Sequence, residues 1–201
     1  TQDKMTPDKS LNELKLGNQR FVNKNQLNRD LLRQVKETST GQYPFATILS
    51  CIDSRVSSEL IFDQGIGDIF SVRIAGNFVN EDILGSMEFA CKLAGTKLIV
   101  VLGHTACGAV KGACDHARLG NLTALINKIE PAVDAVIEPQ DKSLRNSSNI
   151  EFVNRVAEKN VEMTISEIRS ASSVLNEMEK NGEIKIIGGI YDIASGLVSF
   201  N

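Results

Sequence analysis

Apolar positions along the chain fall into short, nearly continuous runs separated by longer segments with helical spacing. Runs that are apolar at almost every position are typical of strands buried on both faces of a parallel sheet. We expect five such strands, at 45–49, 69–73, 97–102, 184–190 and 197–200.

The segments between these runs show the spacing of helices. One begins at the capping residue Asn80 and runs to Leu93, and another follows the loop that opens at His104. Two more are expected at 122–137, interrupted by Pro131, and at 150–180. Alternating strands and helices predict an α/β fold with a mainly parallel central sheet flanked by helices.

The first forty residues predict a helical arm of two polar helices. The first begins at Pro7, a favoured first helical residue, and carries Leu11, Leu14 and Phe21 on its apolar side. This arm is expected to pack across the main domain or across a second subunit. Because no repeat or flexible linker interrupts the chain, residues 1–201 are expected to form a single domain, with the arm at 1–40 and an α/β core at 41–201.

Composition and charge exclude two classes of partner. The 201 residues carry a formal net charge of −3 and no basic stripe, so we expect no binding to nucleic acid. The apolar runs are far shorter than the roughly 20 residues that span a bilayer. We therefore expect a soluble protein, cytoplasmic or periplasmic. The chain opens at Thr1, and both a removed leader and a native start at Met5 remain open.

The candidate chemistry lies after two of the expected strands. Cys51 follows the first strand, and His104 and Cys107 follow the third. Because ligands of parallel sheets bind beyond the carboxyl ends of the strands, these side chains are expected to meet. Thiolate and imidazole suit zinc, and three protein ligands leave the fourth position for water or substrate, as in catalytic sites.

Two further residues beside the first ligand fit the same chemistry. Asp53 can accept a hydrogen bond from a zinc-bound hydroxide, and a bidentate Arg55 would keep that carboxylate ionised and aimed. If this pair opened, Asp53 would reach the metal and displace water. The same residue can thus position the nucleophile or close the site.

Plainer interpretations apply to several of these residues. A lone cysteine at the end of an apolar strand is usually a small buried hydrophobe, but the two motifs together favour a metal site. Cys91 is expected in the core. Cys114 and His116 offer only two ligands, so a helix surface is favoured over an accessory metal site. Gly103 and Gly108 are expected where backbone wraps closely around the metal, or as punctuation between strand and helix.

Three segments carry a family resemblance, at 51–56 (CIDSRV), 72–77 (VRIAGN) and 103–108 (GHTACG). They resemble the signature blocks of the β-class carbonic anhydrases, and the likeness extends from 18–21 to 188–192. The resemblance implies an α/β enzyme, a carbonate dehydratase, that reversibly hydrates carbon dioxide to bicarbonate and a proton. It also implies a homodimer or a dimer of dimers.

Residue roles follow from this resemblance. Cys51, His104 and Cys107 match the ligands of Zn²⁺, and Asp53 with Arg55 matches the catalytic dyad. Substrate contacts are implied for the glutamine nine residues before the first ligand, for three apolar pocket residues, some reaching across a subunit boundary, and for the glycine after the third ligand. These are Gln42, Phe70, Ala75, Phe89 and Gly108.

The sequence also departs from the family pattern. A tyrosine is frequent in the family where Phe89 stands. The subset that traps bicarbonate and closes Asp53 onto zinc has a tryptophan where this chain has Ile48, and the chain contains no tryptophan. Arg73 and Tyr191 match the other two residues of that clamp. The missing tryptophan and the presence of Gln42 favour a permanently open site.

The expected reaction is attack of zinc-bound hydroxide, oriented by Asp53, on carbon dioxide. His116 is too far along the chain from Cys107 to be a proton shuttle, so buffer is expected to carry the proton. Hydrolysis of carbon disulfide or carbonyl sulfide is the alternative reaction. A non-catalytic zinc-stabilised binding protein is the alternative class, against which Gln42, Asp53 and Arg55 argue.

Overall fold

The five expected strands form one sheet in the computed structural model, which describes residues 2–201. The strands are β1 (Ala46–Ser50), β2 (Ile69–Arg73), β3 (Leu98–His104), β4 (Lys185–Tyr191) and β5 (Val198–Phe200). Their order is β2-β1-β3-β4-β5, and only β5 runs antiparallel to its neighbour. The predicted α/β fold with a mainly parallel sheet is confirmed.

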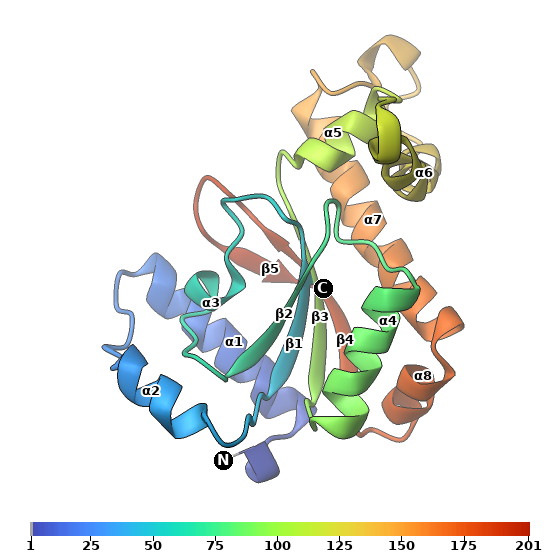
Figure 1. The fold of residues 1–201 in the computed structure, drawn as a ribbon. Helices are drawn as coiled ribbons and strands as arrows, with labels where there is room; N and C mark the ends of the chain where they lie inside the picture. The colour runs from blue at the N-terminus through green and yellow to red at the C-terminus, as the bar shows by residue number, and fades with distance from the viewer. Residues whose placement is uncertain (1) are drawn as a thin grey trace.

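Helices cover both faces of this sheet (Figure 1). They are α1 (Pro7–Val22), α2 (Leu31–Thr38), α3 (Ser58–Ile61), α4 (Glu81–Glu88), α5 (Gly108–Cys114), α6 (Gly120–Ala135), α7 (Ile150–Ala171) and α8 (Ser173–Lys180). Leu14 of α1 packs on one face of β1 and β3, and α4, α7 and α8 pack on the other. In Figure 1, α5 and α6 lie beyond the end of β3, where they form a third cluster with α7.

The helix expected at 150–180 is two helices, because the chain turns at Ser172. This residue is extended (φ −111°, ψ 102°), and its hydroxyl oxygen accepts a hydrogen bond from the Leu175 N–H at 3.1 Å. The same hydroxyl donates to Glu88 Oε1 at 2.6 Å. The hydrogen bonds of buried Ser172 therefore start a new helix here, although the apolar spacing continues through this position.

Pro131 does not interrupt α6, contrary to expectation. The helix runs through it from Gly120 to Ala135. Pro131 is exposed, so the carbonyl group that loses its N–H partner can be hydrated. Two smaller departures are α3, which the sequence did not indicate, and a π-helical turn at Phe89–Leu93 that extends α4.

The N-terminal arm packs on its own chain through buried polar contacts. Asn18 of α1 is 4% exposed and donates to the carbonyl oxygens of Ile61 (3.1 Å) and Gly196 (2.9 Å). Its own oxygen accepts from the Val198 N–H at 2.9 Å. One side chain therefore joins α1 to α3 and to the edge strand β5.

A buried carboxylate holds the following loop in place. Asp63 is 5% exposed, with Arg20 Nε 2.5 Å from its Oδ2 and Arg29 Nη1 2.5 Å from its Oδ1. The Leu27 N–H also donates to it. Burial alone would raise the pKa of Asp63, but the hydrogen bonds from Arg20, Leu27 and Arg29 together lower it.

Replacing this carboxylate tests its contribution to stability. Asp63→Asn removes the charge that pairs with two arginines, and we expect the free energy of unfolding at pH 7 to fall by about 2 kcal/mol. A depressed folded-state pKa gives stability that is present above the unfolded pKa of about 4 and is lost as the pH falls through the folded value. The difference from the parent in urea denaturation should therefore shrink below pH 4.

Asp8→Asn is the matched control for this prediction. Asp8 also pairs with a cation, Lys185, but its side chain is 82% exposed, so its loss should cost under about 0.5 kcal/mol. Equal effects of the two substitutions at pH 7 would contradict the account of Asp63.

Glycines bring α7 unusually close to the sheet. A Cβ atom at Gly103 of β3 would lie 2.7 Å from Val161 Cγ2, and one at Gly188 of β4 would lie 2.7 Å from Val161 Cγ1. The Val161 side chain thus sits between two residues that lack Cβ. The expectation that Gly103 makes room for a metal is wrong, because it makes room for α7.

Candidate metal centre

Three ligand side chains converge where β1 and β3 end. Cys51 follows β1, His104 is the last residue of β3, and Cys107 precedes α5. The two strands are paired neighbours, with Ser50 opposite Leu102. All three residues are buried, and their ligand atoms lie within 4.8 Å of one another. The predicted convergence of these residues is therefore observed.

The spacing of the sulfur atoms suits a tetrahedral ion. Cys51 Sγ and Cys107 Sγ are 3.9 Å apart. Two sulfurs that are each about 2.3 Å from zinc at a tetrahedral angle would be separated by about 3.8 Å. The pair therefore needs almost no rearrangement to hold a zinc ion.

The imidazole of His104 is oriented for coordination. Its Nδ1 lies 2.9 Å from the Thr105 carbonyl oxygen, which can only accept, so Nδ1 carries the proton. Nε2 is then an unprotonated nitrogen, and it is buried with no hydrogen-bond partner in residues 2–201. A buried nitrogen lone pair is costly unless something binds it, and a metal ion beside two cysteine sulfurs does so.

The two thiols influence each other strongly. The pKa of Cys51 is lowered to about 4, chiefly by a hydrogen bond from Cys107, and the Gly76 N–H contributes to this lowering against the opposing effect of burial. The same contact raises the pKa of Cys107. One sulfur is thus readily a thiolate, while the second needs a cation beside it to lose its proton.

Asp53 lies beside the ligands and is held by Arg55. Arg55 Nε is 2.9 Å from Oδ1 and Nη2 is 2.7 Å from Oδ2, and the Arg55 N–H also donates to Oδ1 at 3.0 Å. This bidentate contact holds the pKa of Asp53 well below its usual range. Asp53 Oδ2 is 3.9 Å from His104 Nε2, so the carboxylate faces the centre while remaining paired.

Several contacts that hold the ligand loops were not predicted from the sequence. Arg73 Nε donates to the Cys51 carbonyl oxygen at 3.0 Å, and its Nη2 donates to that of Asp53 at 2.7 Å. Asn154 and Asn160 of α7 contact the loops around Ala106 and Gly76. The one available signal was the position of Asn160, which with Thr164 is one of two polar residues among the buried positions of its helix.

Phe70 and Phe89, expected in an apolar pocket, do contact each other. Their ring centroids are 6.3 Å apart in an edge-to-face arrangement. With Val72 and Arg73 they line an open groove of about 780 Å³ along β2 and α4. Phe89 is nevertheless 48% exposed, which leaves one side of this apolar surface uncovered.

The other expected substrate residues are dispersed. Gln42 is exposed and precedes the amino end of β1, whereas Cys51 follows its carboxyl end, so one chain does not bring Gln42 to the ligands. Ala75 lies half-buried in the loop after β2. Gly108 is exposed, and a Cβ there would meet nothing within 4 Å, so tight wrapping does not explain this glycine.

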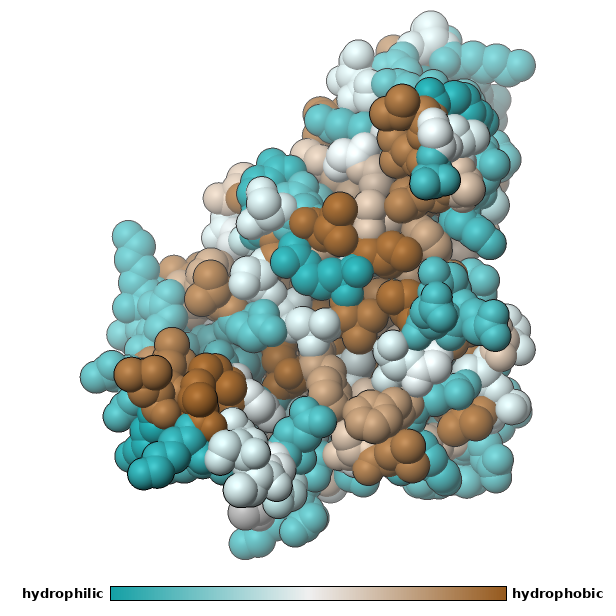
Figure 2. All heavy atoms as spheres, in the orientation of Figure 1, coloured by the Kyte–Doolittle hydropathy of each residue, from teal (hydrophilic) through white to brown (hydrophobic). Residues whose placement is uncertain are grey.

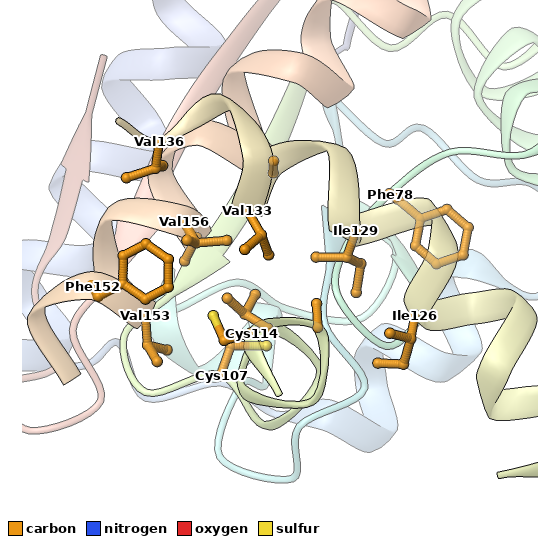
Figure 3. Packing of buried hydrophobic residues seen from close by; sticks show 14 of the residues in the cluster. Phe78, Cys107, Cys114, Ile126, Ile129, Val133, Val136, Phe152, Val153 and Val156 are labelled. Atoms are coloured by element: carbon orange, nitrogen blue, oxygen red, sulfur yellow. The ribbon is translucent and has the colours of Figure 1, made fainter. Parts of the chain in front are cut away.

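The remaining cysteines are core residues. Cys91 is buried, as expected, and burial raises its pKa to about 11. Cys114 is also buried, so the expectation of a helix surface is wrong for it, because its thiol packs between α5, α6 and α7 (Figure 3). His116 is exposed, and its Nδ1 lies 2.9 Å from Glu130 Oε1.

Comparison with known proteins gives one consistent result. The family profile described as "Carbonic anhydrase" matches residues 46–198. "Carbonic anhydrase 2" of Mycobacterium tuberculosis is 34% identical over 189 residues, which cover 91% of this chain and 87% of that protein. The crystal structure of a β-carbonic anhydrase from Aspergillus fumigatus has a TM-score of 0.74 and 29% identity, covering 85% of this chain and 81% of that one.

A second solved structure agrees with the first. The β-carbonic anhydrase of Coccomyxa, in complex with acetazolamide, has a TM-score of 0.70 at 25% identity, and the match covers 82% of this chain and 75% of that one.

Within residues 2–201, none of the helices has the length and apolar character needed to cross a membrane.

Proposed function

Because the chain belongs to the β-class carbonic anhydrases, we propose that it hydrates carbon dioxide reversibly to bicarbonate and a proton at a zinc ion held by Cys51, His104 and Cys107. The observation that carries this proposal is the donor set, in which two sulfurs and an unpartnered imidazole nitrogen converge in a buried site. When bound, zinc would act as a Lewis acid that lowers the pKa of water enough to give hydroxide near neutral pH.

Asp53 is the residue that orients the nucleophile. An ionised carboxylate can only accept hydrogen bonds, so it fixes the direction of the one O–H group of the attacking hydroxide. The bidentate contact with Arg55 keeps Asp53 ionised and keeps its oxygens from moving onto the metal as a fourth ligand. The site therefore retains a position for substrate.

The groove along Phe70 and Phe89 is the entry for carbon dioxide in this proposal. The apolar rings of Phe70 and Phe89 suit an uncharged substrate, whereas Arg73, Glu81 and Asp82 make the rest of the groove polar. The amide of Gln42 can donate a hydrogen bond to a substrate oxygen. Since Gln42 lies at the other end of β1, that contact is assigned to a second copy of the chain.

A homodimer, alone or paired into a dimer of dimers, is therefore part of the proposal. Figure 2 shows apolar side chains gathered over α2. In and before this helix Leu27, Leu31, Leu32 and Val35 are each about half or more exposed, and α2 has no buried residue. An amphipathic helix whose apolar face is bare is stabilised by burying that face against another surface.

A charged residue in this patch should separate the subunits. Leu32 is 82% exposed, so Leu32→Glu should fold normally, shift the mass measured by light scattering toward the monomer and lower hydration activity. Leu119→Glu is the matched control, because Leu119 is 72% exposed but precedes α6, far from α2 (Figure 1). An unchanged mass for Leu32→Glu would remove α2 from the interface.

A side-by-side assay with three gases tests the reaction. Stopped-flow measurement with carbon dioxide, carbonyl sulfide and carbon disulfide should show rapid turnover with carbon dioxide alone. Turnover of a sulfur analogue without hydration of carbon dioxide would replace the proposed reaction with the alternative. No turnover by zinc-loaded protein would favour a binding protein.

A further inference from the structure

We propose that helix α7 is a brace for the metal centre, in which Asn154 and Asn160 are positioning residues that hold the two loops carrying the ligands. This inference rests on the proposed function, since it concerns the same site. It assigns a role to two residues about 9 Å apart along one helix axis.

Asn160 acts on the loop beside Cys51. It is 3% exposed, and its Nδ2 donates to the Gly76 carbonyl oxygen at 2.7 Å. The N–H of the same glycine points to Cys51 Sγ at 3.4 Å. Gly76 has a φ of +80°, which glycine adopts without strain as one of several conformations open to it. The hydrogen bond from Asn160 to its carbonyl oxygen holds Gly76 in this conformation and so fixes the direction of its N–H.

Asn154 acts on the loop between the other two ligands. Its Oδ1 accepts a hydrogen bond from the Ala106 N–H at 2.9 Å. Ala106 lies between His104 and Cys107 and has a φ of +53°, a conformation that costs a residue with a Cβ roughly 1–2 kcal/mol. The hydrogen bond opposes relaxation of this strained residue, which would swing the two ligands apart.

The helix that carries both asparagines is itself firmly seated. Val161 fits between Gly103 and Gly188 on the sheet, and a Cβ at either glycine would approach it to 2.7 Å. Close contact with β3 and β4 fixes the distance of α7 from the strand that ends at His104. The side-chain amides of Asn154 and Asn160 are thus held at a fixed distance from the loops that they contact.

The two positions need opposite chemistry, which provides a sharp test. Position 160 faces a carbonyl oxygen and needs a donor, whereas position 154 faces an N–H group and needs an acceptor. Aspartate is only an acceptor. Asn154→Asp should therefore preserve the brace, and Asn160→Asp should break it by placing a carboxylate against the Gly76 carbonyl.

The experiment measures metal affinity by chelator competition with Zn²⁺ and Co²⁺, on the full chain. Asn154→Leu and Asn160→Leu should weaken binding by about 10–100-fold, as for other residues that orient ligands. Asn154→Asp should stay within about threefold of the parent, and Asn160→Asp should weaken like the leucine variants. In the Co²⁺ proteins, the sulfur-to-cobalt absorption band should shift only in the weakened variants.

Amide hydrogen exchange on metal-free protein gives a readout that does not depend on the metal. Asn154→Leu should speed exchange at Ala106, and Asn160→Leu at Gly76, by at least tenfold. Thr164→Val is the matched control, because Thr164 is also 3% exposed on α7, and no hydrogen bond joins its side chain to either loop in the described chain. Asn160→Ser, which keeps a donor, serves if the leucine variant does not fold.

The outcomes separate this inference from the proposed function. Unchanged exchange and metal affinity in both leucine variants, or equal effects of the two aspartate substitutions, would overturn the brace. A parent protein that binds zinc but hydrates no carbon dioxide would overturn the proposed function and leave the affinity comparison intact. A parent protein that binds no metal would also overturn the proposed function, but the comparison of amide hydrogen exchange between the variants would still test the brace.

Discussion

Cys107→Ser should lose zinc and hydration activity together. Cys107 is 1% exposed and supplies one of only two sulfurs, 3.9 Å from the other. A serine oxygen is a weaker ligand that stays protonated at neutral pH, so we expect zinc affinity to fall by more than about 100-fold. Elemental analysis of purified protein, together with stopped-flow hydration of carbon dioxide, measures both effects.

Cys114→Ser provides the matched control for this substitution. Cys114 is also buried and lies in the same cluster as Cys107 (Figure 3), but it is not one of the three converging residues. This variant should keep one zinc per chain and most of its activity, although its stability will fall slightly. Full zinc occupancy and full activity in Cys107→Ser would remove this residue from the ligand set.

Asp53→Asn should have the second largest effect and a different signature. The substitution leaves the three ligands in place, so zinc should remain at one per chain. The amide can donate as well as accept, and it weakens the contact with Arg55, so the nucleophile loses its fixed orientation. We expect kcat for hydration to fall by about 100-fold.

The pH dependence of this variant follows from the depressed pKa of Asp53. Hydrogen bonds from Arg55 keep the carboxylate ionised at every pH above its ordinary range, so it does not titrate between pH 6 and 9. The rate loss in Asp53→Asn should thus be constant across this range. Ser54→Ala, a change at the exposed neighbouring residue, should leave the rate unchanged. A loss as large in Ser54→Ala, or turnover by Asp53→Asn equal to the parent's, would contradict the assigned role.

The fold and the convergence of Cys51, His104 and Cys107 could be predicted because both depend on local patterns. Runs such as 98–102 are apolar throughout, and the residues after them fall at one edge of a parallel sheet by geometry alone. That rule is sufficient to bring Cys51 to His104 and Cys107. The Asp53–Arg55 contact also spans only two residues, so it too is visible in the sequence.

The contacts that support the site could not be predicted in the same way. Asn154 meets a residue 48 positions away and Asn160 one 84 positions away, so their roles depend on where α7 sits on the sheet. The break at Ser172 likewise depends on Glu88, which is distant in sequence. Helical spacing reports which face is buried but not which partner a polar side chain meets there.

Cys114 and Gly108 show a related limit. A cysteine next to charged residues resembles a surface position until α6 and α7 are seen to cover it. Gly108 directly follows Cys107 in the sequence, yet a Cβ at this position would meet nothing within 4 Å. Its place next to Cys107 therefore did not indicate that other atoms pack closely against it. Position along the chain is therefore a weaker guide than position in the sheet.

The most direct test of the account is to titrate zinc into metal-free protein while following the rate of carbon dioxide hydration. Three protein ligands around one ion predict a rate that rises linearly and stops rising at one zinc per chain. A rate that does not depend on zinc, or one that keeps rising well beyond one equivalent, would contradict a catalytic zinc held by Cys51, His104 and Cys107.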